Sequence, residues 1–331
     1  MTLKKAHMLY GVVALLLAAI LPLVVQDYGN RLLNSAVISA IAVIGLNFVF
    51  GYAGLISLAH GAFVGLAAYV VAMLTTAHGW NPWAAALIAV GTSSLCAYVT
   101  GRILLRLKGH YLALATLGLN VSFTIVASNW MELTGGTNGI SNIPALSIGG
   151  LALDDERSFY WFALIVLAVL ASIAARVRHS HAGRAFMAVR DDELATAMTG
   201  LPVTGIKVAA FTLGAAYAAV AGCLFAFHIR FVSPEDFNFS HSIVYLAMLV
   251  VGGEGSIVGA ILGSVAVTML PEFLRGVGNA YLLVFGLLVL VILVVLPRGL
   301  VSLFERTTYL KFGNRRKASM LTAFTQAGGR K

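Results

Sequence analysis

The feature that most constrains this chain is its series of long apolar runs, separated by short polar segments. A bilayer core of about 30 Å is crossed by about 20 apolar residues in helical form. Ten runs approach that length, at residues 8–25, 32–50, 54–76, 83–105, 110–130, 158–175, 207–229, 241–252, 256–270 and 280–297. The eighth and ninth are short for a full crossing, so they are expected to be tilted, broken or partly re-entrant. The count is therefore about ten helices, or nine or eight if these two merge or fail to cross.

Composition supports a membrane protein. Of 331 residues, 60% are hydrophobic and 11% charged, whereas soluble domains have about 45–50% apolar and about 25% charged residues. Such a chain lacks the polar side chains to cover a water-facing surface. Lys4 and Lys5 before run 8–25 resemble a signal peptide, but Gln26–Gly29 offers no small-x-small cleavage site, so the run is interpreted as a first span. The fold class predicted is an all-α polytopic membrane protein.

Positive charge predicts the orientation of the spans. With the N-terminus inside, 18 of the 22 lysine and arginine residues fall in cytoplasmic segments, as the positive-inside rule requires. The exceptions lie on the outer side, and they are Arg31, Arg157, Arg230 and Arg275. This orientation makes both termini cytoplasmic. It also puts all four tryptophans, Trp80, Trp83, Trp130 and Trp161, at outer span ends, where amphipathic rings concentrate. The net charge of +9 is thereby explained without a nucleic-acid partner.

The acidic residues and the missing motifs limit the energy source. All thirteen Asp and Glu residues lie in loops or at span ends, which argues against a proton-coupled carrier with a carboxylate inside the membrane. Sodium coupling through unwound backbone carbonyls stays open. No Gly-Lys pair occurs, so the chain has no Walker-type phosphate loop. Hydrolase motifs and metal-ligand spacings are also absent from the sequence, so we predict no catalytic residues, no metal site, no bound cofactor and no enzyme activity.

Polar residues form a thread inside the spans. Asn47, Ser57 and His60 lie among glycines, and Asn120 lies in the fifth run. Ser57 and Gly61 are four apart, so they are expected to share a helix face, as are Gly61 and Gly65. One interpretation is close helix packing at small residues, with His60 as a helix-to-helix hydrogen-bonding residue. The other is a polar strip along a translocation path, formed by Asn47, Ser57, His60, Gly61 and Asn120.

The longest inner polar segment is residues 176–207. Ala185–Thr199 contains good helix formers and ends at Gly200-Leu201-Pro202, which predicts one helix. An apolar stripe of Met187, Leu194, Met198 and Leu201 is expected opposite Arg190, Asp191 and Asp192. Two interpretations are equal on spacing alone: a helix on the inner membrane surface, or a helix docking into a groove of a soluble partner.

Three smaller features complete the organisation. The outer loop 131–157 is rich in turn formers. Residues 1–303 are predicted to form one transmembrane domain, followed by a basic cytoplasmic tail at 304–331 that lies on anionic lipid headgroups or is disordered. Gly51-Tyr-Ala-Gly54 weakly echoes Gly252-Gly-Glu-Gly255, which is slight evidence for an internal repeat.

Three motifs, in order, resemble one transporter family. They are Ile44–Tyr69 (IGLNFVFGYAGLISLAHGAFVGLAAY), Leu133–Gly139 (LTGGTNG) and Gly183–Gly200 (GRAFMAVRDDELATAMTG). These resemble LivM-type permeases, the membrane subunits of branched-chain amino acid ABC importers, from about Asn34 to Leu303. The sister LivH-type subunits resemble the chain less. One departure is at Val121, near which many relatives carry a glutamate, so urea or short amides stay open as alternative substrates.

The resemblance implies a multi-pass subunit of the bacterial inner membrane, with no ATPase site of its own. It implies a second, LivH-like permease, two cytoplasmic ATPase subunits that bind ATP and magnesium, and an extracytoplasmic substrate-binding protein. Transport would be by alternating access, with branched-chain or related amino acids passing along the Asn47–Tyr69 motif. By resemblance, the segment that couples to the ATPases includes Gly183, Arg184, Arg190, Asp191, Asp192 and Gly200. The binding protein would dock near Thr134, Gly135, Gly136 and Asn138. A self-contained sodium-coupled carrier or facilitator of a small neutral solute is the competing hypothesis.

Overall fold

Each apolar run that lies within the described residues forms a helix. The computed structural model describes residues 20–23, 25–148, 151–274, 286–287, 290–291 and 299–302. The long helices are α2 (Asp27–Leu46), α3 (His60–Thr76), α4 (Pro82–Leu104), α5 (His110–Asn129), α7 (Glu156–His179), α10 (Val203–Ile229), α11 (Phe239–Gly252) and α12 (Ile257–Phe273). They account for eight of the ten predicted runs. Runs 8–25 and 280–297 fall largely outside the described residues, as does the tail 304–331.

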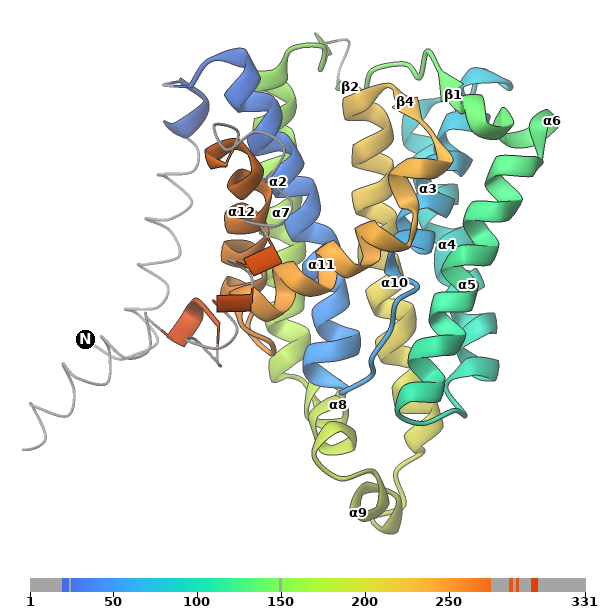
Figure 1. The fold of residues 1–331 in the computed structure, drawn as a ribbon, viewed down its shortest axis with the longest axis vertical. Coiled ribbons are helices and arrows are strands. Elements are labelled where there is room, and N and C mark those ends of the chain that lie inside the picture. Colours follow the sequence, from blue (N-terminus) through green and yellow to red (C-terminus); the bar gives the residue numbers. More distant parts are fainter. Residues whose placement is uncertain are drawn as a thin grey trace, which may run out of the picture.

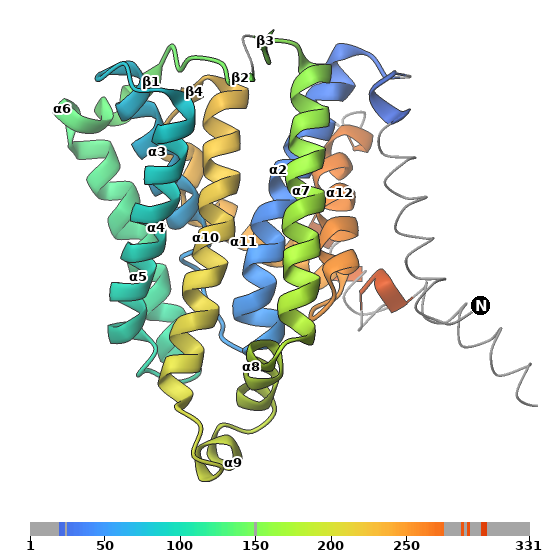
Figure 2. The same cartoon turned by 180° about the vertical axis from the view of Figure 1, so that it is seen from behind.

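The long helices differ in how much of their surface is buried in the bundle. The α2 span, extended by the π-helical turn η1 (Asn47–Tyr52), is 78% buried over its most apolar window, and α10 is 67% buried. For α4, α5 and α7 the values are 28%, 22% and 33%, and these helices expose large apolar side chains such as Leu87, Leu114 and Ile165. Figure 2 shows α10 between α4 and α7 on the back of the bundle. The central helices α2 and α10 are thus surrounded by helices whose outward apolar faces suit contact with lipid.

Glycines allow α2 and α10 to pack closely. A Cβ atom added at Gly45 would lie 2.6 Å from the carbonyl oxygen of Gly214. An added Cβ at Gly214 would in turn lie 2.8 Å from the carbonyl oxygen of Gly45. Both separations are shorter than any side chain tolerates, so only glycine permits this backbone approach. Close packing at Gly45 and Gly214 is therefore part of the fold.

The two ends of the bundle carry different small elements (Figure 1). One end holds α6 (Met131–Thr134), η2 (Gly136–Asn138), the antiparallel pair β1 (Ile140–Ser141) and β4 (Phe231–Val232), and the pair β2 (Ser147–Ile148) and β3 (Leu151–Ala152). After β4, η3 (Pro234–Phe237) packs against Gly65 and Tyr69 of α3. The opposite end holds α8 (His181–Asp191) and α9 (Glu193–Met198), which project beyond the long helices. Apart from the four two-residue strands, the regular secondary structure of the described residues is helical, as predicted.

Ion pairs respect the same division. Arg31 pairs with Glu156 and Arg230 with Asp154, and all four residues were assigned to the outer side. Lys108 and Lys207 both pair with Glu193, and these belong to segments assigned to the cytoplasm. The structure therefore brings together the loops that the charge distribution placed on one side. We refer below to the α8–α9 end as the inner end.

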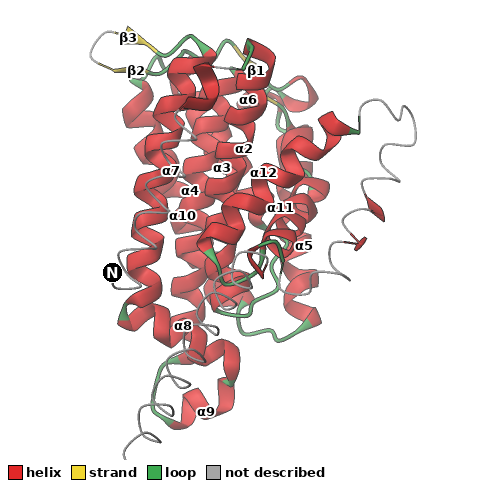
Figure 3. Ribbon diagram, turned by 90° about the vertical axis from the view of Figure 1, so that its left-hand side faces the viewer, coloured by secondary structure: helices red, strands yellow, loops and turns green. Residues whose placement is uncertain are grey.

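Two spans are interrupted. The run 54–76 is helical only from His60, because residues 53–59 form an unwound stretch after η1. The shared helix face predicted for Ser57 and Gly61 is therefore wrong: Ser57 precedes the helix. Helices α11 and α12 have 14 and 17 residues, or about 21 and 26 Å at 1.5 Å per residue, less than a bilayer core of about 30 Å. They were predicted to be short, and they are separated by residues 253–256. Figure 3 shows α11 and α12 next to each other.

The inner segment contains two helices rather than the single helix predicted for Ala185–Thr199. Asp192 adopts extended backbone, and its Oδ1 accepts hydrogen bonds from the backbone N–H groups of Leu194 (2.9 Å) and Ala195 (3.0 Å). An aspartate in this geometry starts a new helix. The predicted continuous apolar stripe is broken for the same reason. Leu194 and Met198 are highly exposed and Leu201 is exposed, whereas Met187 is half-buried on α8.

A candidate coupling and translocation site

Arg190 on α8 joins two glycine-rich helix breaks. One guanidinium nitrogen donates to the carbonyl oxygen of Gly51, and the other donates to Glu254 Oε1 at 2.6 Å. The breaks also contact each other, because Asn47 Oδ1 accepts the Gly255 N–H at 2.8 Å. Gly54 and Gly255 both have positive φ (+67° and +74°), a conformation that favours glycine. The faint echo between Gly51–Gly54 and Gly252–Gly255 thus corresponds to two segments that meet.

A second polar group holds the other end of the unwound stretch. Thr116 Oγ1 accepts the Leu58 N–H at 3.0 Å, and Asn120 Nδ2 donates to the Leu58 carbonyl at 3.1 Å. Asn120 Nδ2 also donates to Ser242 Oγ at 2.6 Å, and Ser242 Oγ accepts the Gly61 N–H at 2.9 Å. Helices α3, α5 and α11 are therefore linked at the start of α3. Asn120 Oδ1 is buried without a hydrogen-bond partner among the described residues.

The five residues predicted to line a path separate into different surroundings. Gly61 and Asn120 meet at Ser242, while Asn47 lies at the inner glycine breaks. Ser57 stays within the unwound stretch, where its Oγ accepts the Ala59 N–H at 3.4 Å. The His60 ring contacts the Ala42 carbonyl on α2 at 2.7 Å, which is the helix-to-helix hydrogen bond expected of it.

Two related features follow from the same contacts. Gly61 and Gly65 do share a face, since a Cβ at either would contact Phe237. Sequence reasoning missed Ser242, the residue that joins α11 to this group. Its only signal was a lone serine near the start of a short apolar run.

The predicted coupling residues have distinct structural roles. Gly183 is buried against the end of α7, where a side chain would overlap the backbone of Val177 and Arg178. Arg184 is exposed and donates to the His179 carbonyl at 3.1 Å. Asp192 caps α9, and Gly200 ends the segment with φ +82°. Asp191 is exposed beside the pocket described below. Within this set, Arg190 contacts the bundle across the longest sequence separation.

In the outer loop, most of the predicted docking residues shape the backbone. Thr134 Oγ1 donates toward the carbonyls of Ala127 (2.6 Å) and Trp130 (2.7 Å) and is buried. Gly135 and Gly136 have φ of +73° and +61°. Asn138 has its side chain exposed. The loop therefore presents Asn138 on a backbone shaped by the other three residues.

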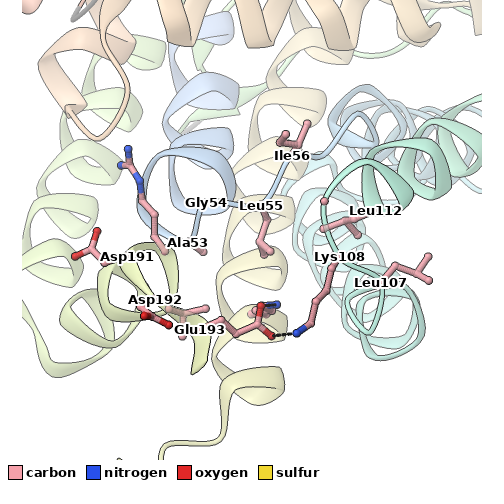
Figure 4. Close-up of a pocket in the computed structure, with 14 residues that line it drawn as sticks. Ala53, Gly54, Leu55, Ile56, Leu107, Lys108, Leu112, Asp191, Asp192 and Glu193 are labelled. Carbon is pink, nitrogen blue, oxygen red and sulfur yellow. Dashed lines mark ion pairs between the residues drawn. The ribbon is translucent and has the colours of Figure 1, made fainter. Parts of the chain in front are cut away.

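A pocket of about 230 Å³ opens at the inner end between the unwound stretch, the α4–α5 turn and α8–α9 (Figure 4). Lys207 is 5% exposed, and its Nζ lies 2.8 Å from Glu193 Oε2. Lys108 Nζ lies 3.6 Å from Glu193 Oε1. Partial burial acts to raise the pKa of Glu193, but its hydrogen bonds and the charges of the two lysines outweigh that effect and hold the pKa below its ordinary value. Glu193 is therefore an anion held by the ammonium groups of Lys207 and Lys108.

Comparison with known proteins identifies the family. A family model described as "Branched-chain amino acid transport system / permease component" matches residues 30–296. The chain belongs to this permease family. The resemblance inferred from the three motifs is confirmed. Together with the apolar helices, this membership shows a multi-pass membrane protein that is a permease subunit of an importer.

Several named proteins are similar to this chain over most of its length. The permease is 33% identical to the "High-affinity branched-chain amino acid transport system permease protein LivM" of Salmonella typhimurium (strain LT2), over 92% of this chain and 77% of that protein. It is 26% identical to the LivH protein of Escherichia coli (strain K12), over 80% of this chain and 91% of that protein. A "Fructose import permease protein FrcC" of Rhizobium meliloti is 27% identical over 71% of this chain and 68% of its own length. No solved structure matches the chain.

Proposed function

We propose that this permease is one of two membrane subunits of an ATP-driven importer of branched-chain or related amino acids in the bacterial inner membrane. Its partners are a LivH-like permease, two cytoplasmic ATPases that bind ATP and magnesium, and an extracytoplasmic binding protein. The names of the LivM and LivH relatives support this assignment of substrate class and pairing. The binding protein supplies most of the substrate affinity, so the permease itself binds its cargo weakly.

The observation that carries the mechanism is the position of Arg190. It is on the projecting helix α8 and contacts both glycine breaks through Gly51 and Glu254. Next to it, α9 exposes Leu194 (68%) and Met198 (87%), an apolar surface suited to a groove on a soluble partner. An ATPase that displaces α8–α9 therefore pulls on both interrupted spans. This physical connection supports alternating access, in which the breaks serve as hinges.

The polar group around Asn120 and Ser242 lies on the other side of the unwound stretch from this hinge. It offers neutral donors and acceptors at the start of α3. Unwound backbone and half-helix ends form substrate sites in other transporters. We assign the translocation path to this region, with Gly61 and Asn120 nearest to it.

Uptake by the reconstituted importer tests the proposal. The permease, its LivH-like partner, the two ATPases and the binding protein are reconstituted in proteoliposomes, and uptake of labelled leucine is followed with and without ATP. We expect uptake that requires every subunit and ATP, and that excess isoleucine or valine competes but urea, acetamide and fructose do not. Leucine uptake by the permease alone under a sodium gradient would support the carrier hypothesis and contradict ours.

A further inference from the structure

In the pocket at the inner end, the carboxylate of Glu193 occupies a position that the carboxylate of a bound solute could take. Glu193 reaches from α9 and places its two oxygens on Lys207 of α10 and Lys108 of the α4–α5 turn. Lys207 is almost fully buried, and a buried ammonium group requires an anion. Figure 4 shows Glu193 and Lys108 pointing toward one another across the pocket. Three separate elements thus meet at one carboxylate.

The rest of the pocket is apolar or backbone. Leu55, Leu107 and Leu112 line it beside the lysines, and Leu55 and Leu112 are buried. Gly54, Leu55 and Ile56 belong to the unwound stretch. The N–H groups of Gly54 and Leu55 donate back to the carbonyls of Phe50 and Val49, so the carbonyl oxygens of this stretch are the groups that suit an ammonium. The two lysines suit the carboxylate of an aliphatic amino acid, and the leucines suit its side chain. The backbone of the unwound stretch suits its ammonium group.

The position of the pocket relates it to the transport path. The unwound stretch runs from Ala53 at the pocket to Ala59, next to the Asn120–Ser242 group. A solute that passes that group and follows the stretch inward arrives at Lys207. The carboxylate in its way belongs to α9, which projects beyond the long helices (Figure 1) at the end predicted to face the cytoplasm. The Thr196 hydroxyl of α9 donates to the Ala188 carbonyl of α8, so the two helices move together, and a displacement of α8–α9 withdraws Glu193 from the two lysines.

We propose that this pocket is a cytoplasmic exit site for a small aliphatic amino acid, whose carboxylate takes the place of Glu193 on Lys207 and Lys108 when α9 moves away. The inference rests on the proposed function and specifies one binding site within it. Glu193 is then a gate that competes with the departing solute. A purely structural ion pair would predict no effect of these residues on binding from the cytoplasmic side.

Inhibition of uptake from the ATPase side tests the site. In the complete importer, the half-inhibitory concentration is measured for leucine and for leucinamide, which lacks the carboxylate, both added on the ATPase side. We expect leucine to inhibit and leucinamide to fail. Glu193→Gln removes the competing charge, so leucine should inhibit at a concentration about ten-fold lower, the value of one charge-assisted hydrogen bond. Lys207→Gln should raise that concentration by a similar factor.

The controls separate this inference from a folding defect and from the proposed function. Lys207→Arg keeps the charge and should restore inhibition if Lys207→Gln impairs assembly. Arg106→Gln removes an exposed charge in the same turn as Lys108 and should match the wild type. Equal inhibition by leucinamide, no inhibition by leucine, or an unchanged value in Glu193→Gln would each overturn the exit site while ATP-driven uptake stays intact. Loss of leucine uptake in the wild-type importer would instead refute the proposed function.

Discussion

Asn47 and Gly255 lie 208 positions apart, yet the Asn47 side-chain oxygen accepts the Gly255 N–H at 2.8 Å. The contact ties the end of the α2 span to the break between α11 and α12. Arg190 reinforces it from α8 by contacting Gly51 and Glu254. The break after α2, the break between α11 and α12, and helix α8 therefore meet at one place. Displacement of any one of them shifts the contacts of the other two.

Removing the Asn47 side chain should destabilise this junction. In Asn47→Ala the half-buried Gly255 N–H loses its acceptor, which costs about 1 kcal/mol. We expect a lower thermal unfolding midpoint for the purified complex in detergent. Asn129→Ala is the matched control, because Asn129 makes an exposed hydrogen bond to Ile125. Equal midpoints for the two variants would show that the Asn47 contact adds nothing to stability.

Arg190 should be required for coupling. Arg190→Ala removes the link from α8 to both breaks, so substrate-stimulated ATP hydrolysis should fall at least about ten-fold, the effect of losing about 1.4 kcal/mol of interaction. Asp191→Ala should have a smaller effect, because Asp191 is exposed. Arg176→Ala, at an exposed position on the end of α7, serves as the control. If Arg190→Ala and Asp191→Ala both co-purify with the ATPases and hydrolyse ATP normally, the coupling surface is assigned incorrectly.

The exposed apolar residues of α9 should form the docking surface. Met198→Glu places a charge at a side chain that is 87% exposed and, in our proposal, buried by the ATPase. We expect less ATPase to co-purify while the permease pair stays assembled. Thr199→Glu adds the same charge at the neighbouring exposed position and should have the weaker effect. Undiminished co-purification of Met198→Glu would instead favour a helix lying on the membrane surface.

Gly61 should be intolerant of a side chain. A Cβ there would lie 2.8 Å from Ser242 Oγ and 3.2 Å from Asn120 Nδ2, so Gly61→Ala should lower both uptake and the unfolding midpoint. Gly91→Ala in α4 meets no atom within 4 Å and should be neutral or stabilising by up to about 1 kcal/mol. The double variant with Ser242→Ala should recover part of the loss. No recovery would show that Ser242 is not the clashing group.

The contribution of Glu193 should depend on pH in one direction. Because its pKa is lowered in the folded protein, the ion pairs stabilise fully above the ordinary glutamate pKa of about 4.3. That stability is lost as pH falls through the lowered value. The difference in unfolding midpoint between the wild type and Glu193→Gln should be constant from about pH 6 to 8 and shrink below about pH 4. A difference that grew on acidification would contradict the assignment of Glu193 as the charged partner.

Local patterns in the sequence predicted the helices well. Hydrophobic runs located eight long helices within the described residues, five of them long and apolar enough to cross a membrane, because a span must be long and apolar wherever it sits. They did not reveal that residues 53–59 are unwound, because Leu55 and Ile56 are as apolar as the residues of a membrane helix. Nor did they reveal the break at Asp192, where a short side chain captures backbone N–H groups that a continuous helix would have used.

From the sequence alone come the membrane class and the prediction of which loops share a side, because these depend on composition and on the positions of the charges. The tertiary structure alone decided which polar residues act together. It separated Asn47 from Asn120, added Ser242 and placed Glu193 on two lysines from other elements. The physical reason is that spacing reports which face of one helix a residue occupies, whereas these contacts form where different helices are interrupted and packed against each other.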